Sequence, residues 1–280
     1  MATKPHISFE FFAAKTPEGR QKLKTTCQEL SKFSPEFFSV TYGAGGSTRG
    51  TTKQLVLDIQ QQGYQAAPHL SFGGDSSAEV LALVDAYKEA GISNLVALRG
   101  DLPSGVGGTK LVHANELVAL IREHSGDYFD INVAAYPEIH PEAESYDQDI
   151  YWLGEKLKAG ANRAITQYFY NPDAYFQFID SCQKAGIDKP IVPGIMPLTN
   201  YHNLLRFSDS CGAEIPRWLR WKLKELSANP EDLINYGIEV VTKLCETLIA
   251  GGAPGLHFYT MNQWQVSDRL CRNLGLPEKQ

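Results

Sequence analysis

A single carboxylate stands inside an apolar run close to the start of the chain. In the stretch ISFEFF, which begins at residue 7, Glu10 is flanked by Phe9 and Phe11. Side chains alternate between the two faces of a strand, so Glu10 is expected to point away from the side that its phenylalanine neighbours occupy. Apolar surroundings raise the pKa of a carboxyl group, whereas an ion pair with Arg99 would keep it ionised. We expect the first state, a carboxyl group that keeps its proton near neutral pH.

Other polar residues follow apolar runs at the points where those runs end. If the runs are parallel strands of one barrel, their carboxyl ends meet at a single rim, where barrel enzymes carry their active sites. Taken singly, such residues have structural explanations: His69 as a hydrogen-bonded core histidine, Gln167 and Thr41 as fillers of barrel layers. Their convergence at one rim favours a functional site. The rim residues are Glu10, Thr41, Tyr42, His69, Arg99, Asp101, Tyr136, His140, Gln167 and Thr260.

Short motifs exclude some chemistries and leave one alternative open. No metal site is expected, because there is no HxH pair in a strand and no HExxH helix, and EIHPEAE at 138–144 offers ligands only in a loop. A Schiff-base mechanism would need a lysine at a strand end, and none stands there. The glycine-rich GAGGSTRG at 43–50 either brings backbone N–H groups to a phosphate or is a plain loop. RGD at 99–101 is interpreted as a strand end, with Asp101 at the mouth of the site, and not as a cell-adhesion motif.

The elements that must position these residues form a repeating pattern. Most of the apolar runs lie roughly thirty residues apart, the length of one βα unit, and segments with helical period lie between them. The runs are too continuous to have a solvated face, as in parallel sheets covered on both sides. We therefore predict an α/β fold, a (β/α)8 TIM barrel; a doubly wound sheet is disfavoured because no GxGxxG opens the first helix. The eight runs begin at residues 7, 37, 66, 94, 130, 163, 190 and 256.

Capping residues mark where the helices begin. Thr16 stands before a proline, and Ser76 with Glu79 three residues later forms a capping box. The interval 200–255 is longer than one repeat requires. We expect it to hold an extra helix in IPRWLRWKLKEL, ahead of a long helix that Asn229 caps, before the last strand.

Composition limits the class of partner. The chain has 280 residues with 26 basic and 32 acidic side chains, a formal net charge of −6, which argues against nucleic acid. No run of about eighteen apolar residues and no signal-peptide pattern is present, so we expect no membrane partner and a cytoplasmic protein. The five cysteines are odd in number and far apart, which suits neither a disulfide framework nor a metal site. No linker divides the chain, so residues 1–280 are expected to form a single barrel domain.

Eight stretches, in order from residue 8 to residue 262, resemble the methylenetetrahydrofolate reductases, flavin-dependent barrel enzymes of one-carbon metabolism. ALRGD and AAYPEIHPEA are the most specific of them. The chain resembles the short bacterial form, without the regulatory domain of animal enzymes. The other matching stretches are SFEFF, SVTYGAGGS, AAPHL, AGANRAITQYFY, PGIMPLTN and HFYTMN.

This resemblance implies an activity and its cofactors. The expected reaction is reduction of 5,10-methylenetetrahydrofolate to 5-methyltetrahydrofolate, which supplies methionine synthesis. Bound FAD would be reduced by NADH or NADPH and would then pass a hydride to the folate at the same flavin face, so ping-pong kinetics are expected. The substrates are the folate and the nicotinamide nucleotide, and the family also implies a homo-oligomer.

Residue roles carry over from the same resemblance. Glu10 matches the general acid that protonates N10 of the folate, and Asp101 matches the aspartate beside flavin and pterin. Gln167 matches a residue that contacts both substrates in turn, and Phe207 an aromatic that stacks on substrate. The expected substrate-binding residues are Glu10, Thr41, Asp101, Gln167, Asn203, Phe207 and Met261. The expected FAD-binding residues are Thr41, Tyr42, Ala44, His69, Arg99, Gly100, Asp101, Ala114, Tyr136, His140, Ala143, Asp149 and Lys156.

Some positions depart from the family pattern. Trp152 and Glu155 stand where an Asn and an Arg face FAD, and Gln263 replaces an Arg that helps to hold folate. Asn203 stands in place of a Gln that touches substrate. These departures bear on the adenine end of FAD and on folate affinity more than on the chemistry. Two other interpretations stay open: a flavin-free barrel transferase for a pterin or phosphorylated ligand, and a flavin- or folate-binding module without catalysis.

Overall fold

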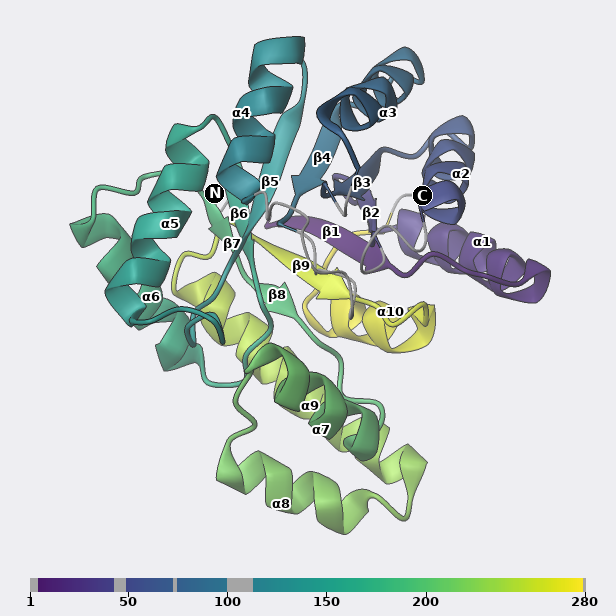
Figure 1. Cartoon of the computed structure of the whole chain (residues 1–280). Coiled ribbons are helices and arrows are strands. Elements are labelled where there is room, and N and C mark those ends of the chain that lie inside the picture. The colour runs from purple at the N-terminus through teal and green to yellow at the C-terminus, as the bar shows by residue number, and fades with distance from the viewer. Residues whose placement is uncertain (1–4, 43–48, 73–74, 100–112, 279–280) are drawn as a thin grey trace.

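The computed structural model describes residues 5–42, 49–72, 75–99 and 113–278. The expected site residues Ala44, Gly100 and Asp101 therefore lie outside the described residues. Parallel strands form the centre of the molecule and helices surround them (Figure 1). The strands are β1 His6–Phe11, β2 Phe38–Val40, β3 Ala66–Leu70, β4 Asn94–Ala97, β5 Asp130–Ala135, β6 Arg163–Thr166, β7 Ile191–Val192, β8 Gly194–Ile195 and β9 Gly255–Tyr259.

The sheet closes on itself. Its strand order is β7-β6-β5-β4-β3-β2-β1-β9-β8, and only Pro193 separates β7 from β8 along the chain. β7 pairs with β6 and β8 pairs with β9, so residues 191–195 act as one interrupted strand. Pro193 has no N–H to give, but its carbonyl accepts a hydrogen bond from the backbone of His257 at 3.0 Å. The eight predicted strands and the barrel are thus confirmed.

Local capping explains where the helices begin. Ser76 and Glu79 form the predicted capping box, and Thr16 accepts from the backbone N–H of Gly19 ahead of Pro17. The helices are α1 Pro17–Ser31, α2 Arg49–Gln61, α3 Ser77–Glu89, α4 Ala114–Ser125, α5 Tyr146–Lys158, α6 Pro172–Lys184, α7 Tyr201–Cys211, α8 Arg217–Leu226, α9 Pro230–Ala250 and α10 Trp264–Asn273.

The insertion before the last strand is larger than predicted. The expected extra helix is α8, and the long helix capped by Asn229 is α9. A third helix, α7, precedes them, with Asn200 accepting from the backbone N–H of Asn203 at its start. In Figure 1, α7, α8 and α9 lie together on one side of the barrel, with α8 farthest from the strands. Within the described part of the chain, no helix is both long and apolar enough to cross a membrane.

Alternation along β1 separates the apolar layer from the barrel interior. Phe9 and Phe11 are buried in the large cluster between strands and helices. A smaller cluster, which includes Phe37, Val96 and Ile165, is separate from it. Glu10 lies between the two phenylalanines in sequence and turns the other way, as predicted. The fold thus places one carboxylate inside the barrel.

Candidate active site

Glu10 lies between two histidines from other strands. Its Oε2 is 3.2 Å from Nε2 of His69, on β3, and 3.3 Å from Nε2 of His257, on β9. The other ring nitrogen of His257, Nδ1, is 2.7 Å from the hydroxyl of Ser8. The Glu10 side chain is 14% exposed and that of His257 is 1% exposed. The four residues make a buried acid–base network, which we call the Glu10 network.

The protonation state expected for Glu10 was wrong. Burial alone raises the pKa of this carboxyl group, but the charge of His69 and the hydrogen bond with His257 lower it more, so its pKa falls to about 2. The alternative partner, Arg99, pairs instead with Glu142. Glu10 is therefore ionised, and the two histidines stabilise its negative charge.

His257 belongs to the site but was missed from the sequence. A signal was present: it stands between Leu256 and Phe258, which are fully buried in the apolar layer, so alternation turns it inward. In the register of β1 against β9, His257 lies directly opposite Ser8. A search for polar residues at inward-facing positions of the predicted strands would have found His257.

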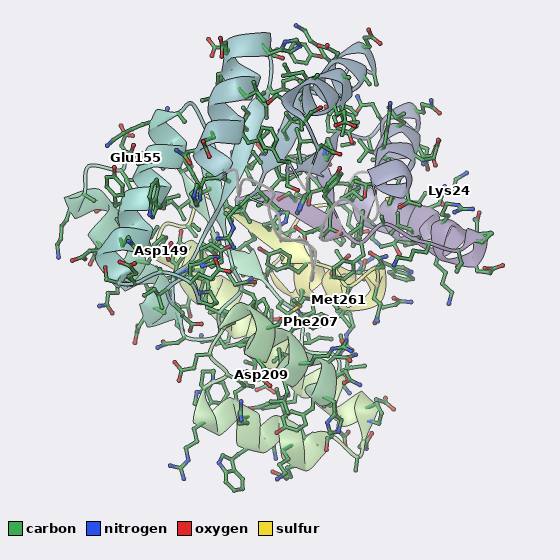
Figure 2. The ribbon with its side chains drawn as sticks, viewed as in Figure 1. Lys24, Asp149, Glu155, Phe207, Asp209 and Met261 are labelled. Carbon is green, nitrogen blue, oxygen red and sulfur yellow. The ribbon has the colours of Figure 1, made fainter. Side chains whose placement is uncertain are left out.

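A cavity of about 410 Å³ opens at the carboxyl ends of β3, β4 and β5. Its lining comes from α4, α5 and the segments that follow the strands, and Figure 2 shows Asp149 on α5 at this side of the barrel. Eight of the residues expected to bind FAD line it: Tyr42, Arg99, Ala114, Tyr136, His140, Ala143, Asp149 and Lys156.

The cavity holds a buried cation whose charge is only partly compensated. Lys156 donates to the carbonyl of Ala134 at 2.5 Å, and burial lowers its pKa to about 8 although the charge of Asp149 opposes this shift. Asp149 in turn accepts from the backbone N–H of His140 at 2.8 Å, and its own pKa is raised by burial. Burial, and then the charge of Arg99, lower the pKa of His140. An anionic ligand would stabilise this arrangement, so the donor set fits a phosphate-bearing cofactor.

Two departures from the family pattern lie at this cavity or near it. Trp152 lines the cavity and stacks on His113, with ring centroids 5.8 Å apart and planes 7° apart. Glu155 points elsewhere and pairs with Lys158 at 2.9 Å. An aromatic pair thus stands where polar contacts to FAD were expected.

The remaining expected residues lie at other points of the same end of the barrel. Thr41 follows β2, and Gln167 follows β6, where its side chain accepts from the backbone N–H of Tyr168. Thr260 donates to the carbonyl of Glu10 at 2.7 Å and so ties β9 to β1. Met261 has a positive φ of 53° in the turn after β9. This turn also holds Gln263, at the start of α10.

The two α7 residues differ in exposure. Phe207 is half-buried and packs against the apolar core, whereas Asn203 is exposed. Figure 2 shows Phe207 on the side of α7 nearer the barrel and Asp209, which is exposed, on the far side. Phe207 therefore lies on the side of α7 that faces the barrel.

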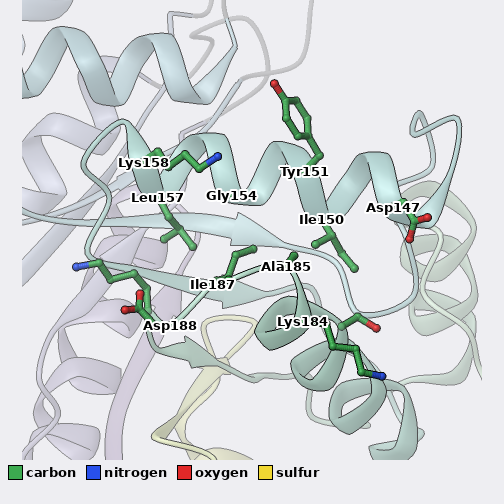
Figure 3. A pocket seen from close by; sticks show the side chains of 13 residues that line it. Asp147, Ile150, Tyr151, Gly154, Leu157, Lys158, Lys184, Ala185, Ile187 and Asp188 are labelled. Atoms are coloured by element: carbon green, nitrogen blue, oxygen red, sulfur yellow. The ribbon is translucent and has the colours of Figure 1, made fainter.

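A second cavity, of about 590 Å³, lies away from the Glu10 network and from the first cavity. It is bounded by α5, α6 and the segment after α6, with residues such as Ile150, Leu157 and Ile187 at its base (Figure 3). None of the expected site residues lines it. In the described residues, no cluster of histidine, cysteine or carboxylate side chains is suited to a metal.

Comparisons with known proteins identify the family of the chain. The family profile of methylenetetrahydrofolate reductase matches residues 1–275. The 5,10-methylenetetrahydrofolate reductase of Pectobacterium carotovorum is 40% identical over 272 residues, covering 97% of this chain and 90% of that protein. The enzyme of the same name from Escherichia coli K12 is 39% identical over the same length, covering 97% of this chain and 91% of that protein.

Two further comparisons reach beyond the bacterial enzymes. The Arabidopsis thaliana protein named methylenetetrahydrofolate reductase (NADH) 1 is 37% identical, and this chain spans 48% of its length. A solved structure described as an uncharacterized protein from Clostridium thermocellum that binds two copies of 5-methyl-5,6,7,8-tetrahydrofolic acid has a TM-score of 0.65 at 15% identity, covering 98% of this chain and 95% of that one. That likeness concerns the fold. By sequence over nearly its whole length, the chain belongs to the methylenetetrahydrofolate reductase family of oxidoreductases.

Proposed function

We propose that this protein reduces 5,10-methylenetetrahydrofolate to 5-methyltetrahydrofolate with NADH or NADPH through bound FAD. The observation that carries the proposal is the Glu10 network, an acid–base group held inside the barrel at the end where the cationic cavity opens. Family membership supports the folate reaction.

The cavity residues would hold the cofactor. Lys156 and Arg99 supply the positive charge that a pyrophosphate needs, and Tyr136, His140 and Ala143 line the wall beside them. A bound FAD supplies hydride chemistry to both substrates in turn, which makes the kinetics ping-pong. Asp101, two residues after Arg99 in sequence, is proposed to face the flavin and the pterin.

The Glu10 network would supply the proton that opens the folate ring. In methylenetetrahydrofolate, the bond between the methylene carbon and N10 must break, with its electron pair moving to N10, before the carbon can accept a hydride. Because Glu10 is ionised at rest, we propose that the protonated, imidazolium form of His257 first passes its Nε2 proton to Oε2 of Glu10 and is left neutral, and that Glu10 then protonates N10. The resulting iminium carbon accepts the hydride and becomes the methyl group.

Other parts of the proposal concern contacts and assembly. Gln167 and Phe207 would contact the nicotinamide and the folate in turn, with Thr41, Asn203 and Met261 at the edges of the site. We propose that the chain acts as one catalytic domain over residues 1–280, assembles as a homo-oligomer and works in the cytoplasm.

One spectrum followed by two titrations tests the function. The purified protein should show FAD absorbance, and NADH or NADPH should bleach it without oxygen. Methylenetetrahydrofolate should then restore the colour. A colourless protein that oxidises no nicotinamide would favour the transferase interpretation, and a yellow protein that binds folate without turnover would favour the binding module.

A further inference from the structure

The loop after β5, which lines the cavity, contacts the end of α7. The backbone N–H of Glu214, just after α7, donates to Oε2 of Glu138 at 2.8 Å. Close by, Gly212 ends α7 with φ 75°, and a Cβ added there would lie 2.9 Å from Pro141. Glycine is needed here for both its backbone angle and the close approach. We call these two contacts the 138–214 clasp.

The clasp connects two parts of the proposed active site. Its first half sits in the loop after β5, where Tyr136 and His140 line the cavity. That loop is held firmly: His140 donates its backbone N–H to Asp149, and Ile139 keeps a left-handed backbone with φ 68°. Its second half follows α7, which carries Phe207. The position of Phe207 relative to the cavity therefore depends on the clasp.

A second contact ties the same end of α7 to the barrel. The hydroxyl of Tyr168, next to Gln167, is 3.0 Å from the hydroxyl of Ser208 and 3.5 Å from the sulfur of Cys211. The C-terminal end of α7 thus contacts both the loop after β5 and the segment after β6. Glu138 supplies the acidic side chain in these contacts.

We propose that Glu138 is a positioning residue that holds α7, and Phe207 with it, against the cavity loop, and so sets how tightly both substrates bind. This inference rests on the proposed function, because it assigns α7 to the substrates of that reaction. Glu138 itself contacts neither substrate nor cofactor in this proposal.

The charge of Glu138 makes the clasp sensitive to pH near neutrality. Burial raises its pKa to about 7, the carboxylate of Glu214 adds to this, and the hydrogen bond from the Glu214 backbone opposes it. Tyr168 and Tyr170 also face the group, and its charge contributes to raising their own pKa values. The hydrogen bond that forms the clasp lowers the pKa, so this bond is stronger with the ionised carboxylate and strengthens as pH rises through about 7.

Three variants test the proposal on the full-length protein. Glu138→Ala removes the acceptor, and we expect the KM for both nicotinamide and folate to rise about fivefold, with kcat within twofold. Glu138→Gln keeps a neutral acceptor, so KM should stay near wild type at pH 6.5 and remain flat to pH 8, where the wild-type KM falls. Glu214→Ala keeps the donating backbone N–H and removes only the like charge, so it should match the wild type at pH 6.5.

Hydrogen exchange gives a readout that needs no turnover. In Glu138→Ala, the amides of residues 203–214 should exchange several-fold faster than in the wild type, while those of α9 stay unchanged. Unchanged exchange in this segment together with KM values within twofold would overturn the proposal. If the protein has no reductase activity, the function proposed above fails, and the exchange result still decides whether Glu138 holds α7.

Discussion

Two clusters of charged side chains lie at opposite ends of the barrel. The Glu10 network occupies the carboxyl end of β1, with histidines from β3 and β9. At the other end, Arg163, the first residue of β6, pairs with Glu36 ahead of β2 at 2.6 Å and with Asp130, the first residue of β5. Both clusters join segments far apart in the sequence, so both contribute to holding the barrel closed.

The clusters differ in whether their charges can change. Arg163 keeps its proton throughout the accessible pH range, and its carboxylates are 32% and 34% exposed. His6, which lies 3.5 Å from Glu36, is 67% exposed, so the charge inside this cluster comes from the arginine. In the Glu10 network the partners are imidazoles, the side chains that most often donate and accept protons in enzymes, and the carboxylate is 14% exposed. A permanent ion pair can stabilise a fold but cannot deliver a proton, whereas a histidine–carboxylate pair can do both. The Arg163 cluster therefore stabilises the fold, and the Glu10 network can take part in the chemistry.

Glu10→Gln should have the largest effect. The amide keeps the shape of the side chain but cannot carry the proton, so reduction of methylenetetrahydrofolate should slow by about a hundredfold or more. Oxidation of NADH or NADPH with an artificial acceptor should stay within twofold, because that half-reaction needs no proton at N10. Separate stopped-flow measurements of the two half-reactions decide this. Folate reduction within a few-fold of wild type would remove Glu10 from the acid role.

The same variant has a signature in stability. Since the pKa of Glu10 is lowered to about 2, its pairs with protonated histidines stabilise the fold at pH 4.5, and this contribution is lost as pH falls from 4.5 toward 2. Urea unfolding of Glu10→Gln should therefore show a shallower loss of stability over that window than the wild type.

Arg163→Met should break the Arg163 cluster. In contrast to Glu10→Gln, it should lower stability and leave the reaction rates unchanged. It leaves Glu36 and Asp130 without their arginine, and we expect a loss of about 2 kcal/mol of unfolding free energy, less than for a fully buried pair because water reaches both carboxylates. Rates of both half-reactions should stay within twofold. Lys222→Met, at an exposed pair with Glu225, is the matched control and should cost under about 0.5 kcal/mol. A slowed folate reaction in Arg163→Met would undo the division between the two clusters.

The fold was predictable because its signals are local. Each strand is a continuous apolar run, and the Ser76 and Asn229 caps sit where the structure begins α3 and α9. The start of α7 at Asn200 was missed, because a single asparagine cap is a weaker signal than a capping box. Alternation also predicted correctly that Glu10 turns inward.

The partners of Glu10 were not predictable in the same way. His257 is 247 residues away along the chain, and only the register of β1 against β9 brings it to the carboxylate. Without that register, the apolar neighbours of Glu10 suggested a raised pKa. Burial does raise it, but two histidines reverse the result. Sequence patterns indicate how deeply a group is buried more reliably than which charges it meets there.

His257→Leu should separate the two sources of the Glu10 proton. With the imidazole gone, Glu10 must take its proton from solvent, so folate reduction at pH 7 should fall about tenfold and should recover as pH is lowered. His257→Gln can still donate to Glu10 but cannot lose a proton, and should resemble the leucine variant in rate. Measured over pH 5.5 to 8.5, an unchanged profile in both variants would exclude His257 as the donor.

Ser8→Ala should have the smallest effect and shows how the network is ordered. Ser8 is buried, and its hydroxyl is 2.7 Å from Nδ1 of His257. If the imidazolium of His257 donates Nδ1–H to this hydroxyl, its Nε2 proton is directed at Glu10, and the neutral imidazole left after the transfer keeps its proton on Nδ1. Without the hydroxyl either tautomer is allowed, so folate reduction should slow about threefold and stability should fall by about 1 kcal/mol. Ser8→Thr, which keeps a hydroxyl on a strand, should restore the rate. A loss as large as that of His257→Leu would mean that the serine carries the proton rather than directing it.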